Sequence, residues 1–486
     1  MKLFRTKHRR KIMRQSGASR RRLAVQMLES RRLLAGDTYY VDSVNGNDTL
    51  AGDSEVSAWK SLNRLESQTL NPGDQVLLRR GSNWNDRLDL TASGTDSDRI
   101  VFDAYGTGEL PVINAVNVDG SFTTLKNLIV DHGKQSGDAI QIRSANNVTL
   151  RDMVVRNGTS DGIDVDKANG LLIDGLLIHH FLAGSFTAQA DAHGIVATDT
   201  DGLTIRNSEI HHVSGDSFQA DPDRDMDITT NVLIENSHFW TSPLQVDFNS
   251  SWLAGQRPGE NAIDTKVVKQ DWESVPRMQM TVRNVTANGW QKDSFISNKA
   301  AFNIKEKVDV VFDGVTVYDN EIAFRLRGTR GNADVTIING VIHDNEKAIR
   351  AEDDLANLTV LNTTFGDGTG TTLQFAGGSG GTGSWDLRNN AFLASKPSVA
   401  SDASNLAATT SDFVDTTTAD YHLAAGSVLI DAGITLAEVP VDRDGTARPE
   451  GTGYDVGSYE LQAVGQPTLN FNDYVIGSYG GSQDSA

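Results

Sequence analysis

The stretch DGIDVDKANGLLIDGLLIHH, residues 161–180, contains one complete repeating unit of this sequence. It begins with a short cassette: a polar residue, a small residue, a bulky apolar residue, and then alternating positions that end in a charge. Two further apolar runs follow, each alternating with a period of two residues and broken by Asn, Asp or Gly. A helix would need apolar residues at positions i, i+3 and i+4. The spacing therefore predicts three short β-strands separated by turns.

The cassette recurs along the middle of the chain. Successive bulky residues are 22–25 residues apart, except at three longer gaps of 32, 45 and 39 residues, which predict inserted loops. Repeats of this length stack so that neighbouring units bury one continuous core. We therefore predict an all-β fold, a parallel β-helix with three short strands per coil. The bulky residues predicted to face the core are Ile140, Ile163, Ile195, Phe218, Ile263, Phe302, Phe324 and Ile349.

The segments on either side of the repeats predict a cap at each end. A solenoid needs caps because its terminal coils would otherwise expose the core. WKSLNRL (59–65) has the apolar spacing of a short helix that closes the first coils, and YHLAAGSVLIDAG (421–433) belongs to the closing segment. The predicted divisions are a basic leader at 1–36, an N-terminal cap with the first coils at 37–115, β-helix repeats at 116–400, a C-terminal cap at 401–460 and a flexible tail at 461–486.

Composition excludes several classes of function. Residues 1–36 hold 12 of the 44 Lys and Arg residues and one acid, Glu29, so the rest of the chain is strongly acidic. Such a body repels phosphates, which argues against nucleic-acid binding. The chain has no Cys, which excludes disulfides and thiolate chemistry. No apolar run is long enough to span a membrane. We expect a monomer.

The basic leader ends in LESRRLLAG, residues 28–36, directly before the first strand-like run. This ending resembles the N-terminal export segment of many planctomycete surface and secreted proteins. The resemblance implies a secreted or cell-surface protein. The alternative is a disordered basic leader without an export role.

The two ends and the repeats together resemble a known superfamily. The opening YYVDSVNGNDTLAG (39–52), the repeats, and the closing DRDGTARP (442–449) and YDVGSYE (454–460) are similar to secreted right-handed parallel β-helix proteins of the pectate-lyase-like superfamily. The resemblance covers nearly all of residues 37–460 and implies a right-handed coil. That superfamily includes lyases, hydrolases, epimerases and adhesins, so the fold alone does not assign a reaction.

One outward face of the coils gathers charged and polar residues. If the bulky residue of each cassette points inward, the residues one and three positions later point outward. Lys266, Lys305 and Arg327 then follow one another on neighbouring coils. Because cationic neighbours disfavour an ammonium group, the pattern predicts a lowered pKa for Lys305, which suits a general base. The outward residues are Gln141, Asp164, Val196, Gln219, Asp264, Asn303, Arg325 and Arg350 in one row and Arg143, Asp166, Thr198, Asp221, Lys266, Lys305, Arg327 and Glu352 in the other.

This face predicts a lyase acting on an acidic polysaccharide. Polysaccharide lyases of the resembled fold use a Lys or Arg base, commonly with calcium, which implies Lys305 or Lys266 as the base, assisted by Arg325 and Arg327. The base would remove the C5 proton of a uronic acid while the C4 oxygen departs. Asp221 and Asp264 are the predicted ligands for Ca²⁺. Asn303, Arg350 and Gln219 are the predicted substrate-binding residues.

Other functions remain open from the sequence. Asp164 with Asp166 or Asp221 offers paired carboxylates for a glycoside hydrolase. His193 could return a proton in a C5-epimerase, and the charged face could belong to a non-catalytic carbohydrate-binding or adhesive module. The pairs His179-His180 and His211-His212 end successive runs. Four imidazoles could bind zinc, but adjacent strand residues point to opposite faces, so at most one histidine of each pair could join such a site, and we expect polar turn residues instead.

Overall fold

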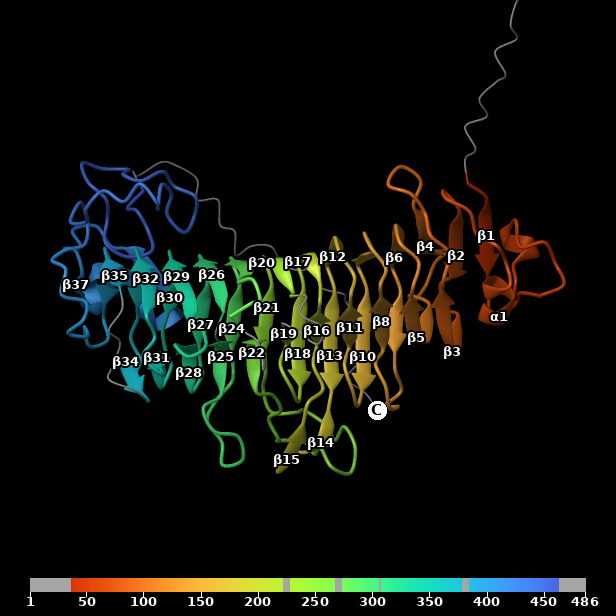
Figure 1. Ribbon diagram of the computed structural model, residues 1–486, viewed down its shortest axis with the longest axis horizontal. Helices are drawn as coiled ribbons and strands as arrows, with labels where there is room; N and C mark the ends of the chain where they lie inside the picture. The colour runs from red at the N-terminus through yellow and green to blue at the C-terminus, as the bar shows by residue number, and fades with distance from the viewer. Residues whose placement is uncertain (1–35, 222–227, 267–272, 306, 378–383, 463–486) are drawn as a thin grey trace, which may run out of the picture. The chain divides into compact units, whose positions relative to one another are not determined.

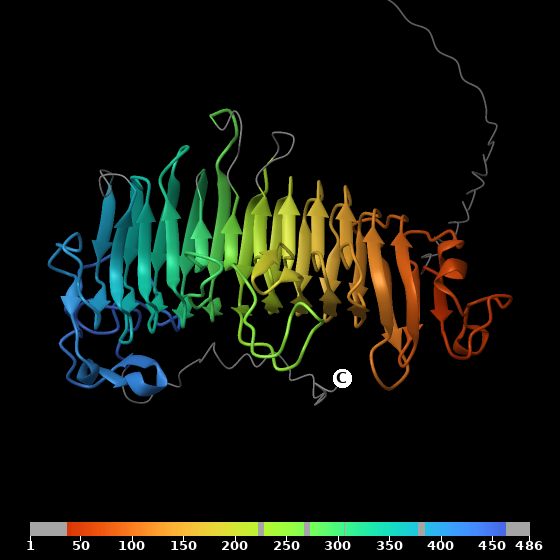
Figure 2. The ribbon, with the colours of Figure 1, turned by 90° about the horizontal axis from the view of Figure 1, so that it is seen from below.

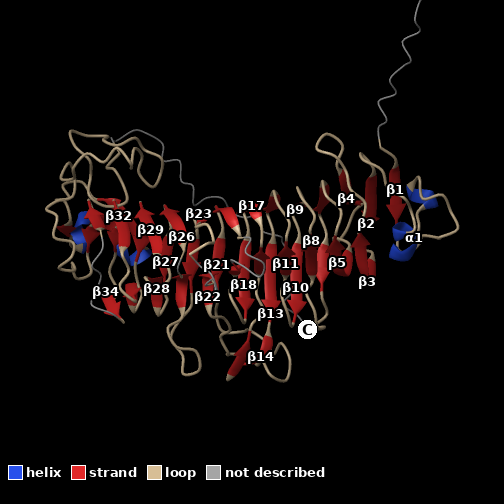
Figure 3. Ribbon diagram, viewed as in Figure 1, coloured by secondary structure: helices blue, strands red, loops and turns tan. Residues whose placement is uncertain are grey.

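The structure is a computed structural model that describes residues 36–221, 228–266, 273–305, 307–377 and 384–462. Each central coil contributes one strand to each of three parallel ladders, which run side by side (Figures 1 and 3). This arrangement confirms the predicted parallel β-helix with three short strands per coil. The predicted leader and most of the predicted tail lie outside the described residues.

The first ladder is a 13-stranded parallel sheet, here called sheet A. Its strands are β1 (Thr38–Val41), β2 (Gln75–Arg79), β4 (Ile100–Tyr105), β6 (Thr123–Lys126), β9 (Thr149–Arg151), β12 (Leu171–Asp174), β17 (Asp201–Arg206), β20 (Thr230–Glu235), β23 (Met278–Arg283), β26 (Val308–Asp313), β29 (Ala333–Ile338), β32 (Asn357–Leu361) and β35 (Trp385–Arg388).

The second ladder carries the cassettes and is called the cassette ladder. Its strands are β3 (Asn83–Leu90), β5 (Val112–Val118), β8 (Ile140–Arg143), β11 (Ile163–Asp166), β16 (Ile195–Thr198), β19 (Phe218–Asp221), β22 (Asn261–Thr265), β25 (Ala300–Ile304), β28 (Ile322–Arg327), β31 (Lys347–Glu352) and β34 (Thr371–Ala376). β5 pairs with both β7 and β8, so the first coils join this ladder to the third one.

The third ladder follows sheet A in each coil and leads into the next cassette. Its strands are β7 (Ile129–Asp131), β10 (Val154–Gly158), β13 (Leu177–Phe181), β18 (Glu209–Val213), β21 (His238–Trp240), β24 (Thr286–Asn288), β27 (Thr316–Tyr318), β30 (Val341–Ile342), β33 (Thr364–Phe365), β36 (Ala391–Phe392) and β37 (Leu406–Ala407).

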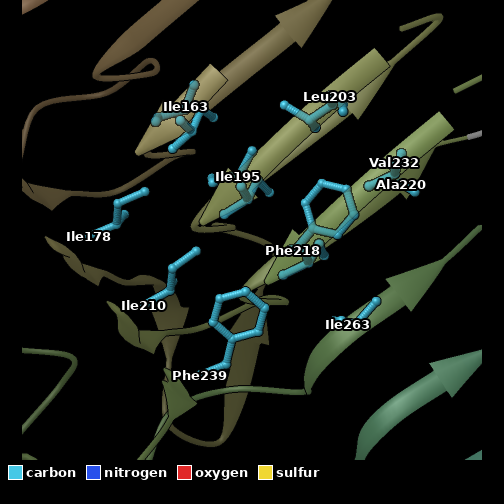
Figure 4. Packing of buried hydrophobic residues seen from close by; sticks show 14 of the residues in the cluster. Ile163, Ile178, Ile195, Leu203, Ile210, Phe218, Ala220, Val232, Phe239 and Ile263 are labelled. Carbon is cyan, nitrogen blue, oxygen red and sulfur yellow. The ribbon is translucent and has the colours of Figure 1, made fainter. Parts of the chain in front are cut away.

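The predicted register of the cassettes is confirmed. Ile163 pairs with Ile140 and Ile195, and the pairing continues through Phe218, Ile263, Phe302 and Phe324 to Ile349. All eight bulky residues are buried. Figure 4 shows Ile163, Ile195, Phe218 and Ile263 in one row, with Ile178, Ile210 and Phe239 of the third ladder in another. Burial of about 25 cal/mol per Å² of apolar surface makes these rows the main source of stability.

The turn after each sheet A strand uses residues that tolerate left-handed backbone. Asn207, Asn236 and Asn284 occupy equivalent places in successive coils, with φ angles of 51°, 49° and 50°. Most side chains clash with the backbone in this region, whereas Asn, Asp and Gly are accepted there. This requirement explains why the apolar runs break at Asn, Asp and Gly.

Both ends carry structure outside the ladders. Near the start, η1 (Glu55–Ser57) and α1 (Leu62–Glu66) precede β2, and α1 buries Leu62 and Leu65 in the core, which agrees with the helix predicted at 59–65. Near the end, η2 (Thr410–Asp412), β38 (Phe413–Asp415), η3 (Thr416–Thr418) and β39 (Asp420–Leu423) form a separate small unit, in which β38 and β39 are antiparallel.

Candidate functional site

Three loops enter the corner between the third ladder and the cassette ladder. They comprise residues 182–191, which include the hairpin β14 (Ala183–Ser185) and β15 (Ala188–Ala190), residues 241–259 and residues 289–299; we call them the loop wall (Figure 2). Leu182, Leu244, Phe248 and Trp252 form a small apolar core of their own. The rings of Phe186 and Phe295 lie 5.1 Å apart. The loop wall therefore stands beside the cassette strands β16, β19, β22 and β25.

Asp264 lies at the centre of a buried cluster on the cassette ladder. It is 1% exposed. Its Oδ2 atom lies 2.7 Å from Nζ of Lys305 and 3.1 Å from Nζ of Lys266. The Lys266 Nζ atom also lies 4.0 Å from Oδ2 of Asp216. With Glu260, these residues form what we call the charge cluster: Asp216, Glu260, Asp264, Lys266 and Lys305.

Two carboxyl groups of the charge cluster have raised pKa values. Burial raises the pKa of Asp216 to about 7, and the adjacent Asp264 carboxylate adds to the shift. Burial and the neighbouring Asp216 raise the pKa of Glu260 to about 7. The Nδ2 group of Asn261 donates a 2.7 Å hydrogen bond to Oδ1 of Asp216. Both groups can therefore hold a proton near neutral pH, as a general acid must.

The lysines of the charge cluster have anionic rather than cationic neighbours. The sequence predicted Lys305 between Lys266 and Arg327, but its Nζ atom is bound to Asp264. Burial alone would lower the pKa of Lys266, yet Asp264 and Asp216 raise it above its ordinary value. The expected run of stacked cations is therefore interrupted by a carboxylate, which weakens the argument for a lysine base.

Three side-chain oxygen atoms at the charge cluster have no hydrogen-bond partner among the residues described. Gln219, Asp264 and Asn303 are register neighbours on β19, β22 and β25. Within the described part of the chain, Gln219 Oε1, Asp264 Oδ1 and Asn303 Oδ1 are buried and have no hydrogen-bond partner. We call this set the acceptor row. Buried polar atoms are usually paired, so an unpaired row indicates a ligand or solvent position.

The arginines further along the ladder bind a carboxylate of this chain. Glu352 accepts hydrogen bonds of 3.0 and 3.1 Å from Arg325 and one of 2.5 Å from Arg350. Arg327 lies 3.2 Å from Asp353 and 3.7 Å from Glu352. Burial opposes ionisation of Glu352, but Arg325 and Arg350 hold the pKa of that carboxyl below its ordinary value. The three arginines of the basic end predicted from the sequence are thus paired with two carboxylates of this chain.

The residues predicted to bind calcium do not form an anionic oxygen cage. Asp264 holds two ammonium groups, which would repel a divalent cation. Asp221 ends β19 one strand away, and its backbone carbonyl accepts a 3.0 Å hydrogen bond from Thr229. Among the residues that the structure describes, no three His, Asp or Glu side chains are placed to hold a metal. The arrangement does not fit Ca²⁺, and no step proposed below is assigned to a metal.

The residues considered for other enzymes are held in local contacts. Arg143 pairs with Asp164 and lies 3.8 Å from Asp166. His193 donates its backbone N–H to Asp161, while its Nδ1 atom accepts the backbone N–H of Asp216 at 2.9 Å. The neutral His193 ring therefore carries its proton on Nε2. This contact fixes the turn that positions Asp216.

The two histidine pairs stack on each other, and the second histidine of each pair has the left-handed backbone expected of a turn residue. His180 and His212 have φ angles of 60° and 51°, so the strand turns before the second histidine. The rings of His179 and His211 are stacked 5.1 Å apart, and those of His180 and His212 are 5.0 Å apart. Trp240 continues the stack at 4.3 Å from His211. The stack supports the corner from which the loop wall arises.

The histidine stack predicts sensitivity to acid. Burial holds the pKa of His179 and His211 well below the ordinary value, and that of His212 at about 3. A lowered folded-state pKa means that the neutral form stabilises the fold above about pH 6.5 and that this contribution is lost as pH falls. We expect the free energy of unfolding to drop by about 1.4 kcal/mol per histidine for each pH unit below 6.5.

Thermal unfolding between pH 7.5 and 5 measures this loss. His211→Phe keeps a ring in the stack but removes one titrating group, so its melting temperature should fall less steeply with acid than that of the unmodified chain. Equal slopes for the two proteins would contradict the assignment.

Sheet A provides a contrast to the charge cluster. A groove of about 500 Å³ lies on its outer face, lined by residues that include Gln279, Thr281, Val311 and Thr336. Beside the groove, basic and acidic side chains alternate from strand to strand. Asp174 pairs with Arg151 and Arg206, and Arg283 pairs with Glu235 and Asp313. Alternating, paired charges are expected of a solvated wall. We therefore place the candidate site at the charge cluster.

The comparisons with known proteins agree with this fold. The family model "Right handed beta helix region" matches residues 114–245, and the family model "Planctomycete extracellular" matches residues 19–38. The solved structure of pectate lyase Pel9A shares the fold with a TM-score of 0.50 at 15% identity, over 87% of this chain and 96% of that chain. The chain is a secreted or cell-surface right-handed β-helix protein. The predicted fold, handedness and export are thereby confirmed.

Two further comparisons cover the chain less fully or less closely. A lacto-N-biosidase of Bifidobacterium longum subsp. longum is 43% identical over 94 residues, which is 18% of this chain and 6% of that enzyme. The β-helix protein thus spans a small part of that relative's length. An alginate lyase structure from Paenibacillus shares 16% identity with a TM-score of 0.42, over 70% of this chain and 98% of that chain. Among the described residues of the β-helix protein, no helix is long and apolar enough to cross a membrane.

Proposed function

We propose that the β-helix protein is a carbohydrate-active enzyme that hydrolyses glycosidic bonds at the charge cluster. The observation that carries the proposal is that Nζ of Lys266 lies 3.1 Å from Asp264 and 4.0 Å from Asp216, which brings a lysine-bound carboxylate close to a buried carboxyl group. Burial raises the pKa of Asp216 and of the adjacent Glu260 to about 7. Glycoside hydrolases need one protonated and one ionised carboxyl group on opposite sides of the scissile bond. The local similarity to a lacto-N-biosidase supports the same reaction class.

Each residue then has a chemical role. Protonated Asp216 or Glu260 donates a proton to the glycosidic oxygen as the bond from that oxygen to the anomeric carbon breaks. Asp264 stabilises the positive charge that develops on the sugar ring, and its Oδ1 atom has no hydrogen-bond partner among the described residues. Lys266 and Lys305 hold Asp264 ionised and oriented. A water molecule then bonds through its oxygen to the anomeric carbon and gives one proton to the carboxylate left on Asp216 or Glu260, which restores the acid and leaves a new reducing end.

The lyase predicted from the sequence is the second candidate. Lys305 and Lys266 lie on the same face as the acceptor row, so an amine is within reach of a bound sugar. In that reaction the lysine takes the C5 proton, the bond from C4 to oxygen breaks, and a C4–C5 double bond forms. The raised pKa of Lys266 opposes this role, because a base must be deprotonated at the working pH.

The products separate the two candidates. The full chain is incubated with neutral and uronate-containing glycans, and both new reducing ends and the ultraviolet absorbance of an unsaturated uronide are measured. We expect reducing ends without absorbance, and activity that falls as pH rises above about 7, where Asp216 and Glu260 lose their protons. Absorbance that disappears in Lys305→Ala but persists in Thr336→Ala on sheet A would establish the lyase instead.

A further inference from the structure

We infer that the acceptor row binds the hydroxyl groups of an uncharged sugar, so that the substrate is a neutral glycan rather than a uronate polymer. This inference rests on the hydrolase proposed above and specifies its substrate class. It departs from the acidic polysaccharide predicted from the sequence, because that prediction relied on cations that the structure places in ion pairs.

The acceptor row needs hydrogen-bond donors. Gln219, Asp264 and Asn303 lie in register on three adjacent strands, where successive strands are about 4.8 Å apart. Each is more than nine-tenths buried and presents an oxygen without a partner in the described chain. Oδ2 of Asp216 is unbonded in the same sense. Sugar hydroxyl groups supply donors at this spacing, whereas a uronate carboxylate supplies acceptors only.

The charges of the site do not favour a uronate. Both lysines of the charge cluster contact Asp264, and Lys266 also faces Asp216. Each ammonium group is therefore already paired with the Asp264 carboxylate, so a substrate carboxylate would have to displace Asp264. The nearest arginine on the ladder, Arg325, forms two hydrogen bonds to Glu352. A carboxylate entering the cluster would lose its hydration and would compete with Asp264 for the two ammonium groups.

A cation is the other ligand that an oxygen row could take. Calcium prefers several oxygen ligands with a high share of carboxylates. Here the one carboxylate of the row has ammonium nitrogens at 2.7 and 3.1 Å, so a divalent ion would face two positive charges at short range. Neutral hydroxyl donors meet no such repulsion. The chemistry of the row therefore favours a sugar.

The test measures binding directly. The full chain carrying Glu260→Gln, which slows turnover, is titrated by calorimetry with neutral hexose and N-acetylhexosamine oligosaccharides and with uronate oligosaccharides of equal length. We expect the neutral series to bind and the uronate series not to bind. Gln219→Leu and Asn303→Leu should each weaken binding of the neutral series by about tenfold, since each removes one hydrogen-bond acceptor.

Controls make the outcome specific. The apolar Val196 already occupies the same row next to Gln219, so the fold accepts a leucine there, and circular dichroism checks each variant. Thr336→Leu on sheet A should leave binding unchanged. Tighter binding of uronates, or calcium binding that Asn303→Leu abolishes, would overturn the inference. Neutral binding without hydrolysis would refute the proposed reaction alone, whereas hydrolysis confined to uronates would refute the substrate class alone.

Discussion

Asp264→Asn lowers the rate of glycan cleavage by about 10²- to 10⁴-fold, the range typical of losing one acid or base group. The substitution keeps the size of the side chain but removes the charge that faces the sugar ring. It also leaves Lys266 and Lys305 without their shared partner at 3.1 and 2.7 Å. Initial rates of reducing-end release over pH 4–9 measure the loss.

A matched substitution on sheet A separates chemistry from folding. Asp313→Asn also removes a carboxylate that pairs with a basic residue, Arg283 at 3.5 Å, but lies outside the site. We expect full activity from Asp313→Asn and an unchanged melting temperature within a few degrees for both proteins. Retention of more than a tenth of the activity in Asp264→Asn would remove the central group of the proposed mechanism.

Arg448→Met destabilises the fold by about 3–5 kcal/mol, the cost of breaking a buried ion pair by removing one partner. Arg448 and Glu460 are both fully buried in their side chains and lie 2.6 Å apart. Arg448 also donates hydrogen bonds to the backbone carbonyls of Asp455 and Gly457. The variant therefore leaves the Glu460 carboxylate with its two backbone N–H donors but without its positive partner, and it leaves two carbonyls without this donor. Urea unfolding, followed by circular dichroism, gives the free energy.

The matched control is an ion pair at the surface. Arg388 lies 2.5 Å from Asp386 but remains partly exposed, so Arg388→Met should cost about 0–1 kcal/mol. The double variant Arg448→Met with Glu460→Gln removes both charges, keeps an acceptor oxygen for the backbone N–H groups that bind Glu460, and should recover part of the stability lost in the single variant. If Arg448→Met and Arg388→Met lowered the free energy of unfolding equally, the buried ion pair would not stabilise the closing segment as predicted.

The fold was predictable because its signal is local and repeated. The eight cassettes place their bulky residues in register without exception, since a period of two fixes which side chains face inward. The closing motifs 442–449 and 454–460 could be recognised in the sequence. The interaction that requires Arg448 and Glu460 in them could not be predicted. That interaction is a contact between two residues that adjoin only in the folded chain.

The candidate site was predictable only in part. The outward rows correctly place Asp264, Lys305, Gln219 and Asn303 on neighbouring strands. The sequence does not show that Lys305 turns toward Asp264, because charge pairing across coils depends on side-chain direction. Asp216 and Glu260 were not among the predicted catalytic residues, since Asp216 is the opening polar residue of its cassette and Glu260 lies directly before the next cassette. In the sequence these polar residues resemble ordinary turn residues. Only their burial in the folded chain distinguishes them from exposed turn residues.

The placement of the loop wall on a single corner has a consequence for how such a protein can change over generations. All three insertions enter between the third ladder and the cassette ladder, while sheet A continues from coil to coil without interruption. Loops at that corner can be lengthened, exchanged or recombined without altering the spacing of any strand. Whole coils can likewise be gained or lost beyond β16 or β28 while the charge cluster stays intact. Recognition of new glycans can therefore be acquired by changing the corner, with the scaffold inherited unchanged.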